Sequence, residues 1–453
     1  MLARRLVWTC ARTFAALAIV FGFGVSMAAA QVSRLDTAPD NTPANAASGY
    51  PVISADGRYV AFVSLASNLT PDDTNESYDF YRFDRVNGVM LRFDLPSRGV
   101  GDLPVPTAIS QDGRWLLFSD LHSDWVSGDT NGAPDVFQAD FMTGTIRRVS
   151  VGTGGVQADC GSSSISMSLD GRLIVFDSCA SNLGPPEWDN GGLTDVFLHD
   201  TQTGETTQLT RSAGGGPANG HSLSARLSPD SEWVAFSSAA TNLTAESDTN
   251  GVVDAFVLHW RTGELFRIGP LRGEASGVTA ANAIAWDASV VAFTSFARNM
   301  VPDAITPGNH AYTWDRLGGF VAHLPPFWTL PASIANEVYS IEISLYGRYA
   351  LVFQPDPQYV RTLVLHDRLL QQRRVIAAPV DGTPHMSLDG RTVAYERDGG
   401  TMRRRSMFRP TGCCRRRTRM ATVFPTGGSS ASGSTRSRRR SRMARMPTPI
   451  RTG

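Results

Sequence analysis

The sequence predicts an all-β fold, a β-propeller of about seven four-stranded blades, of which six are complete and the last is incomplete. A Ser-x-Asp-Gly-Arg element, clearest within Ile109–Arg114, recurs along the chain, and an aromatic residue follows each copy. Successive copies lie 42 to 60 residues apart, and a period of this size indicates an array of similar units. The segments between the turns are short and rich in β-branched and aromatic residues, which favours strands.

The unit that begins near Ile109 shows how one blade is built. Asp112 and Gly113 predict a hairpin turn, because Gly supplies the positive φ that the turn needs. Residues 135–140 and 145–151 read as the third and fourth strands, separated by the turn at Gly144. The aromatic markers of the seven copies are Phe62, Phe118, Phe176, Phe236, Phe293, Phe353 and Tyr395.

The two ends of the chain differ from the array. Residues 1–30 read as a signal peptide, with early Arg residues, the 13-residue apolar run Thr13–Val25 and cleavage expected after Ala30. A membrane anchor is the alternative, but spanning takes roughly 20 apolar residues. The propeller is expected over residues 31–400. Residues 31–35 resemble the fourth strand of a blade, so we expect them to pair into the last blade and close the ring.

Residues 401–453 form an Arg-rich tail that we expect to be disordered. The tail holds 15 of the 42 basic residues and no Asp or Glu, which leaves residues 1–400 with a net charge of −15. We favour a shifted reading frame over a functional basic tail, because the periodicity stops abruptly after Gly400 and the shifted frame allows Asp-Gly-Thr-Asp-Ala near Met443. The acidic body argues against nucleic acid as a partner.

An acidic pattern, Asp-x-Asn with a further Asp six residues after the first, recurs before the third strand of four blades. Carboxylate and amide oxygens around a tight turn suit Ca²⁺, although these turns lack the bidentate Glu of an EF-hand. We favour the alternative, that these side chains cap the turn through its own backbone. The candidate calcium ligands are Asp73, Asn75, Asp79, Asp129, Asn131, Asp135, Asp189, Asp195, Asp248, Asn250 and Asp254.

A second acidic column closes the third strand, and here turn capping is the expected role. Its members are Asp84, Asp140, Asp200, Asp315 and Asp367, with His259 in the fourth blade. In the third blade, Cys160 and Cys179 flank the first hairpin, and Cys179 is expected opposite about Ser162. This spacing permits a disulfide in an oxidising compartment, with buried free thiols as the alternative.

No catalytic residue can be assigned from the sequence. The eight His are scattered without metal-site spacing, and Gly220–Ser224 lacks the last Gly of a nucleophile elbow. An enzyme is therefore the less favoured class.

The repeated Ser-x-Asp-Gly-Arg…Ala-Phe followed by Asp-Val-Phe…Asp…Thr-Gly resembles the TolB-type β-propeller repeat over about residues 31–398. The resemblance implies a six- or seven-bladed propeller, often in exported bacterial proteins that bind other proteins or serve as scaffolds. We therefore expect a periplasmic or secreted, monomeric, non-enzymatic binding protein for a protein or polysaccharide ligand, with calcium as a possible cofactor and no membrane span after signal cleavage. The alternatives are a propeller enzyme of lyase or glycosidase type with its site at the channel mouth, and an inactive product of a broken gene.

Overall fold

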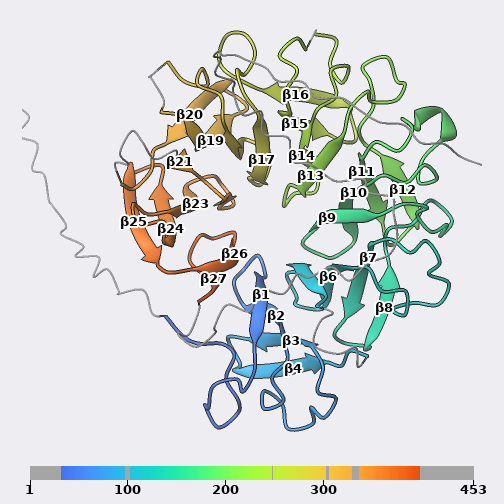
Figure 1. Cartoon of the computed structure of the whole chain (residues 1–453), viewed down its shortest axis with the longest axis vertical. Helices are drawn as coiled ribbons and strands as arrows, with labels where there is room; N and C mark the ends of the chain where they lie inside the picture. The colour runs from blue at the N-terminus through green and yellow to red at the C-terminus, as the bar shows by residue number, and fades with distance from the viewer. Residues whose placement is uncertain (1–31, 97–102, 247, 303–305, 329–335, 398–453) are drawn as a thin grey trace, which may run out of the picture. The chain divides into compact units, whose positions relative to one another are not determined.

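The computed structural model describes residues 32–96, 103–246, 248–302, 306–328 and 336–397. The chain divides into two compact units, residues 1–401 and 402–453. The expected signal peptide and the Arg-rich tail lie outside the described residues. Within the first unit almost every element is a β-strand, which confirms the all-β class (Figure 1).

The first three blades are antiparallel four-stranded sheets in which each strand pairs with the next along the chain. A short 3-10 helix, η1 (Pro186–Trp188), lies between the second and third strands of blade 3. The strands are β1 (Ser48–Ile53), β2 (Tyr59–Ser64), β3 (Asp79–Asp84) and β4 (Val89–Phe93); β5 (Val105–Ile109), β6 (Trp115–Asp120), β7 (Asp135–Asp140) and β8 (Thr145–Arg148); and β9 (Ser162–Met167), β10 (Leu173–Ser178), β11 (Asp195–Asp200) and β12 (Glu205–Gln208).

Blades 4, 5 and 6 repeat this order, with one additional parallel strand in blade 5, β21 (Asn336–Glu337). Their strands are β13 (Ser222–Leu227), β14 (Trp233–Ser238), β15 (Asp254–His259) and β16 (Glu264–Ile268); β17 (Thr279–Ile284), β18 (Val290–Ser295), β19 (Gly308–Asp315) and β20 (Phe320–Leu324); and β22 (Ser340–Ile343), β23 (Tyr349–Pro355), β24 (Arg361–Asp367) and β25 (Gln372–Ala377).

The described residues thus form six four-stranded blades, and those of the last copy of the repeat form the two-stranded sheet β26 (Asp381–Met386) and β27 (Val393–Glu396). The first strands of successive sheets contact one another in the order β1, β5, β9, β13, β17, β22, β26, and β26 in turn contacts β1. The backbone N–H of Leu388 also donates to the carbonyl of Ala55 at 2.8 Å. The hairpin β26–β27 therefore links blade 6 to blade 1.

The expectation that residues 31–35 pair as a strand of the last blade is not met by those of them that the structure describes, because Arg34 and Leu35 lie in no strand. The segment that follows is held against blade 1 instead. The backbone N–H of Asn45 donates to Asn68 at 2.9 Å, and the Asn45 amide oxygen accepts from the N–H of Ser67 at 3.0 Å.

The Ser-x-Asp-Gly turn has the same hydrogen bonds in the blades that carry it. In blade 2 the Ser110 hydroxyl donates to Asp112 at 2.5 Å and accepts from the N–H of Trp115 at 2.9 Å. Gly113 has φ +71°, and a Cβ there would lie 2.5 Å from the ring of Tyr59 in blade 1. Gly171 packs on Trp115 in the same way, so the turn glycines permit close contact between neighbouring blades.

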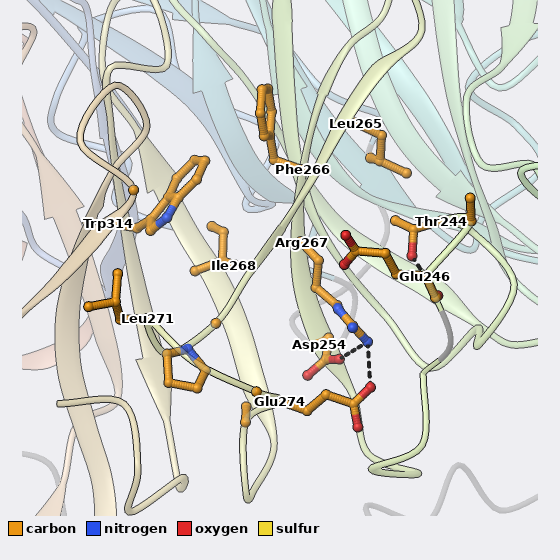
Figure 2. A pocket seen from close by; sticks show the side chains of 16 residues that line it. Thr244, Glu246, Asp254, Leu265, Phe266, Arg267, Ile268, Leu271, Glu274 and Trp314 are labelled. Carbon is orange, nitrogen blue, oxygen red and sulfur yellow. Dashed lines mark hydrogen bonds and ion pairs between the residues drawn. The ribbon is translucent and has the colours of Figure 1, made fainter. Parts of the chain in front are cut away.

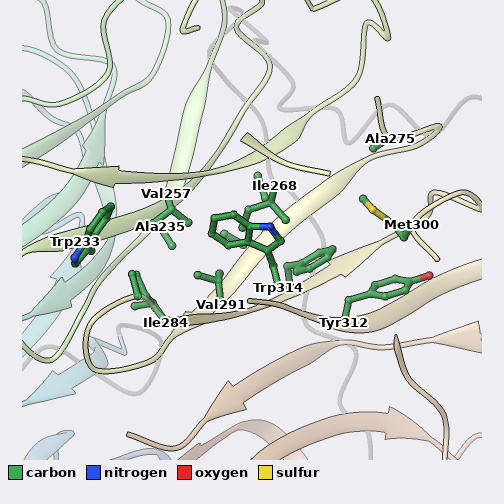
Figure 3. Close-up of a cluster of buried hydrophobic side chains, with 14 of the residues drawn as sticks. Trp233, Ala235, Val257, Ile268, Ala275, Ile284, Val291, Met300, Tyr312 and Trp314 are labelled. Atoms are coloured by element: carbon green, nitrogen blue, oxygen red, sulfur yellow. The ribbon is translucent and has the colours of Figure 1, made fainter. Parts of the chain in front are cut away.

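The cores lie between adjacent blades. Figure 3 shows the cluster in which Ile268 and Val257 of blade 4 pack with Tyr312 and Trp314 of blade 5. Six of the seven predicted aromatic markers are buried, and Tyr395 is partly buried. In five blades the marker stacks on an aromatic of the third strand, as Phe118 does on Phe137 at 5.4 Å. The other stacked pairs are Phe62–Tyr81, Phe176–Phe197, Phe236–Phe256 and Phe293–Tyr312.

Candidate functional site

The second acidic column caps the turn after the third strand, as predicted, and it also forms ion pairs that the sequence analysis missed. Asp140 accepts from the N–H of Met142 at 2.9 Å and from Nη2 of Arg114 at 2.7 Å. Arg114 is the Arg of the Ser-x-Asp-Gly-Arg element, and its hydrogen bond lowers the pKa of Asp140 to about 2. The equivalent pairs are Arg58–Asp84, Arg172–Asp200 and Arg348–Asp367.

The candidate calcium ligands of blade 1 surround an arginine. Nη1 of Arg92, on β4, lies 2.9 Å from Asp79 and 3.3 Å from Asp73. The Asn75 side chain turns its nitrogen toward Asp79 at 3.1 Å, while its oxygen caps the N–H of Ser77. The turn capping that we favoured is therefore present, and a guanidinium lies between the two carboxylates.

Blade 2 repeats this arrangement on its own strands. Nη1 of Arg148 lies 3.3 Å from Asp135 and 3.6 Å from Asp129. Asn131 donates weakly to Asp135 at 3.3 Å, and its oxygen accepts from the N–H of Ala133. Burial raises the pKa of Asp135 above its usual value even with this arginine nearby.

In blade 3 a neutral residue takes the position of the arginine. Gln208 donates to Asp195 at 2.9 Å, and Asn190 donates to the same carboxylate at 2.8 Å. Asp189 accepts from the N–H of Gly191 at 3.0 Å. Burial raises the pKa of Asp195 to about 7, and the charge of Asp189 adds to the rise. In the part of the chain that the structure describes, Asp189 and Asp195 of blade 3 therefore have no arginine between them.

In blade 4 the arginine is shared by three carboxylates. Nη1 of Arg267 lies 3.2 Å from Glu274, 3.6 Å from Asp254 and 3.7 Å from Asp248. Asn250 donates to Asp254 at 3.1 Å. Burial raises the pKa of Asp254 to about 6, and the nearby acids contribute.

In blade 5, His310 replaces the Asp at the start of the third strand and His323 replaces the arginine of the fourth strand. His310 is the first residue of β19 that pairs with β18, and its Nδ1 lies 3.3 Å from Nε2 of His323 on β20. Across the described residues, no group of three or more His, Cys, Asp or Glu side chains is placed to hold a metal ion. Calcium binding stays a prediction.

Cys160 and Cys179 are joined by a disulfide, with their Cα atoms 5.4 Å apart. The pairing of β9 with β10 sets Ser162 opposite Ser178, so the predicted register was wrong by one residue. The other three cysteines, Cys10, Cys413 and Cys414, lie outside the described residues.

A groove of about 540 Å³ runs along the outer edge of β16, between blades 4 and 5 (Figure 2). Leu265 and Arg267 face blade 3, whereas Phe266 and Ile268 face blade 5, and all four line the groove. Residues from both faces of one strand line the same cavity, so the groove surrounds the unpaired edge of β16.

The two sides of the groove differ in chemistry. Figure 2 shows Trp314, Ile268 and Leu271 on one side, with Glu246 and Arg267 on the other. The acids near the groove are Asp248, Asp254, Glu246 and Glu274, against the guanidinium of Arg267 and that of Arg272 in the adjoining loop. The polar side is therefore acidic, and the opposite side is apolar. No sequence motif indicated this groove, because it depends on the 269–275 loop and on Trp314 of the next blade.

Ionisable side chains also meet on the inner strands. Nδ1 of His385 on β26 lies 3.4 Å from the Glu342 carboxylate on β22. The Glu396 carboxylate on β27 accepts from the backbone N–H of Tyr50 on β1, and burial raises the pKa of Glu396. These groups come from β22, the β26–β27 hairpin and β1, where the ring closes.

No helix among the described residues has the length and apolar character needed to cross a membrane.

No family model matches the chain. No curated protein matches it either.

The chain is similar to several solved propellers. An oligogalacturonate lyase in complex with manganese aligns with a TM-score of 0.51 at 12% identity, over 77% of this chain and 85% of the lyase. A TolB candidate from Agrobacterium tumefaciens has a TM-score of 0.37 at 18% identity, over 62% of this chain and 81% of its own. An acylaminoacyl peptidase of Pyrococcus horikoshii has a TM-score of 0.43 at 16% identity, over 75% of this chain and 47% of its own. At these identities the lyase likeness establishes the β-propeller fold and nothing more.

Proposed function

We propose that the protein is a non-enzymatic binding propeller that works in the periplasm or outside the cell, and that the groove along β16 receives its ligand. The proposal rests on the groove, because its volume of about 540 Å³ falls within the range of roughly 300–1,000 Å³ that is typical of ligand-binding pockets. Most carboxylates of the repeat are engaged within their own blades, whereas the Glu246 carboxylate has no ion pair among the described residues. An apolar wall facing an acidic wall suits a peptide or saccharide that presents an apolar face and donor groups.

The test is a binding screen with groove variants. Leu271 is 78% exposed, so Leu271→Asp should leave the fold intact while changing the apolar wall, and Glu246→Arg should reverse the charge opposite. We expect ligands found on peptide and glycan arrays to bind at least about tenfold more weakly to each variant by calorimetry. Met142→Asp, on an exposed turn of blade 2, is the matched control. Ligands that bind all four proteins equally would show that the groove is not the site.

Calcium remains part of the proposal in blade 3, where Gln208 stands in place of an arginine beside Asp189 and Asp195. We expect calcium to raise the melting temperature and a chelator to lower it. Gln208→Arg supplies the guanidinium of the other blades and should abolish this response. An unchanged melting curve of the wild-type protein with chelator would end the calcium hypothesis.

A second candidate function is a lyase or glycosidase site at the channel mouth, favoured by the Glu342–His385 pair on adjacent inner strands. Charged polysaccharides should then be cleaved by the wild-type protein, and Glu342→Gln should lose at least about a hundredfold in rate. Product analysis by mass spectrometry measures the cleavage. Equal rates for wild type and variant would remove this candidate.

A further inference from the structure

The strand β27 corresponds to the second strand of a complete blade, but among the described residues it pairs with only one other strand. In the six complete blades the second strand pairs on both sides, and in five of them, β2, β10, β14, β18 and β23, all or all but one of its residues are buried. Within the described residues β27 pairs only with β26, and one of its four residues is buried. Among the described residues, the outer edge of β27 therefore has no backbone partner and could accept another strand.

Arg391, which precedes β27, does not make the ion pair that the equivalent arginines of other blades make within the described residues. Arg58, Arg114, Arg172 and Arg348 bind the Asp that ends the third strand, and their side chains are 37–44% exposed. Arg391 is 85% exposed, and its ion pair in the described part of the chain is to Asp389 of its own turn, at 3.9 Å. A carboxylate at the end of a third strand would fit this guanidinium.

The first described residues resemble, in their local pairing, the segment that follows the fourth strand of blade 2. Thr37 bridges to Pro43 as Val151 bridges to Gln157 in blade 2. Counting back three residues from Val151 gives Arg148, which lies 3.3 Å from the Asp at the start of the third strand.

The same count from Thr37 gives Arg34. Its side chain is 52% exposed and bonds to Asp36, two residues away. Arg34 and Arg391 thus correspond to the two guanidinium groups that hold the opposite ends of a third strand in blade 2.

Tyr395, the aromatic residue of β27, is the third side chain that would contact an added strand. Tyr395 corresponds to Phe118, which is fully buried and stacks on Phe137 of the third strand. Tyr395 itself is partly buried and packs on one side against the cluster around Leu363 of blade 6. An aromatic side chain two residues after the first Asp of an added strand would meet Tyr395.

Residues 401–453 of the sequence contain no Asp or Glu, so they supply neither of the two carboxylates that would pair with Arg34 and Arg391. We infer that the last blade accepts an extended segment of another protein, with the pattern Asp-x-aromatic-x-x-Asp, which adds as a strand to the open edge of β27. Backbone hydrogen bonds would give affinity, and Arg34, Tyr395 and Arg391 would select the sequence.

The chain's own blade 2 provides the probe, a labelled peptide with the sequence of residues 134–141, Pro-Asp-Val-Phe-Gln-Ala-Asp-Phe. We expect it to bind the full-length protein in fluorescence anisotropy and to raise the melting temperature in proportion to its occupancy. A peptide with Asn at both Asp positions, and the variant with Arg34→Gln and Arg391→Gln, should each weaken binding at least about fivefold. Methylation of alternate backbone nitrogens should abolish it.

Arg374→Gln, an exposed position on β25, is the control that should leave binding unchanged. The inference is overturned if the peptide does not bind, if the methylated peptide binds equally well, or if the two-arginine variant matches this control. It is also overturned if the protein forms dimers that this peptide cannot dissociate, because a second copy would then occupy the edge.

Discussion

The same residue type carries opposite pKa shifts at the two ends of the third strand. Asp140 sits beside Arg114, which lowers its pKa to about 2, whereas Asp195 is buried beside Gln208, and burial raises its pKa to about 7. The first favours the ionised form in the folded protein, and the second favours the neutral form. The two acidic columns of the repeat therefore contain carboxylates whose contributions to stability change with pH in opposite directions.

Asp195 should make the protein less stable as the pH rises. The folded state holds the Asp195 proton to about pH 7, whereas the unfolded chain releases it near 4, so the stabilisation is complete below pH 4 and is lost as the pH rises through 7. Asp195→Asn should remove a pH-dependent change in unfolding free energy on the order of 4 kcal/mol over this interval, measured by urea unfolding at pH 4 to 8. Asp140→Asn is the opposite control, because the stability from Asp140 is lost only as the pH falls toward 2. Identical slopes for wild type and Asp195→Asn would contradict the assignment.

The bond between Cys160 and Cys179 closes a loop across a sequence separation of 19 residues. Its removal should cost on the order of 3 kcal/mol, because the reduced unfolded chain gains conformational freedom. Double replacement by Ser and reduction of the wild type should lower the urea midpoint equally. If peptide mapping without reductant finds both thiols free in protein isolated from an oxidising compartment, the bond does not form there.

At the scale of the element, the sequence predicted the turns and strand register better than it predicted the ion pairs. Ser110, Asp112 and Gly113 define a turn through local hydrogen bonds, and such bonds follow from sequence spacing. The Arg114–Asp140 pair joins residues 26 apart, and the recurrence of both columns in the same blades was the signal that could have revealed it. The groove along β16 gave no such signal, because it arises where a loop of blade 4 meets Trp314 of blade 5.

The turn glycines should matter most where the next blade presses on them. Gly113→Ala introduces a Cβ 2.5 Å from the Tyr59 ring at φ +71°, whereas Gly132→Ala has φ +62° and nothing within 4 Å. The control should lose about 1 kcal/mol from backbone strain, and Gly113→Ala should lose roughly 1–3 kcal/mol more from the clash. Urea unfolding measures both, and equal losses would mean that the blade contact does not constrain the turn.

At the scale of the whole molecule, the blades are linked by contacts of one kind, repeated around the ring. Gly113 packs on Tyr59 and Gly390 packs on Tyr349, each joining a turn to the preceding blade. Gly57 of blade 1 packs in the same way on Thr392, which lies more than 300 residues further along the chain. The hairpin β26–β27 therefore completes the series of contacts, although it has two strands where other blades have four.

Removal of that hairpin should affect the protein far more than removal of the Arg-rich tail. A chain ending at Val380 loses the packing of Met386 and Tyr395 on Leu363 and Leu365, whereas a chain ending at Gly400 keeps it. Because each buried apolar side chain contributes about 2 kcal/mol, the shorter chain should lose at least about 4 kcal/mol and bind a hydrophobic dye, with an unfolding transition that is no longer cooperative. The longer chain should unfold at the same urea concentration as the full-length protein. If the two truncated chains have the same urea midpoint, the hairpin does not hold the ring closed. The strand addition inferred for β27 would then lack the packed hairpin on which it depends.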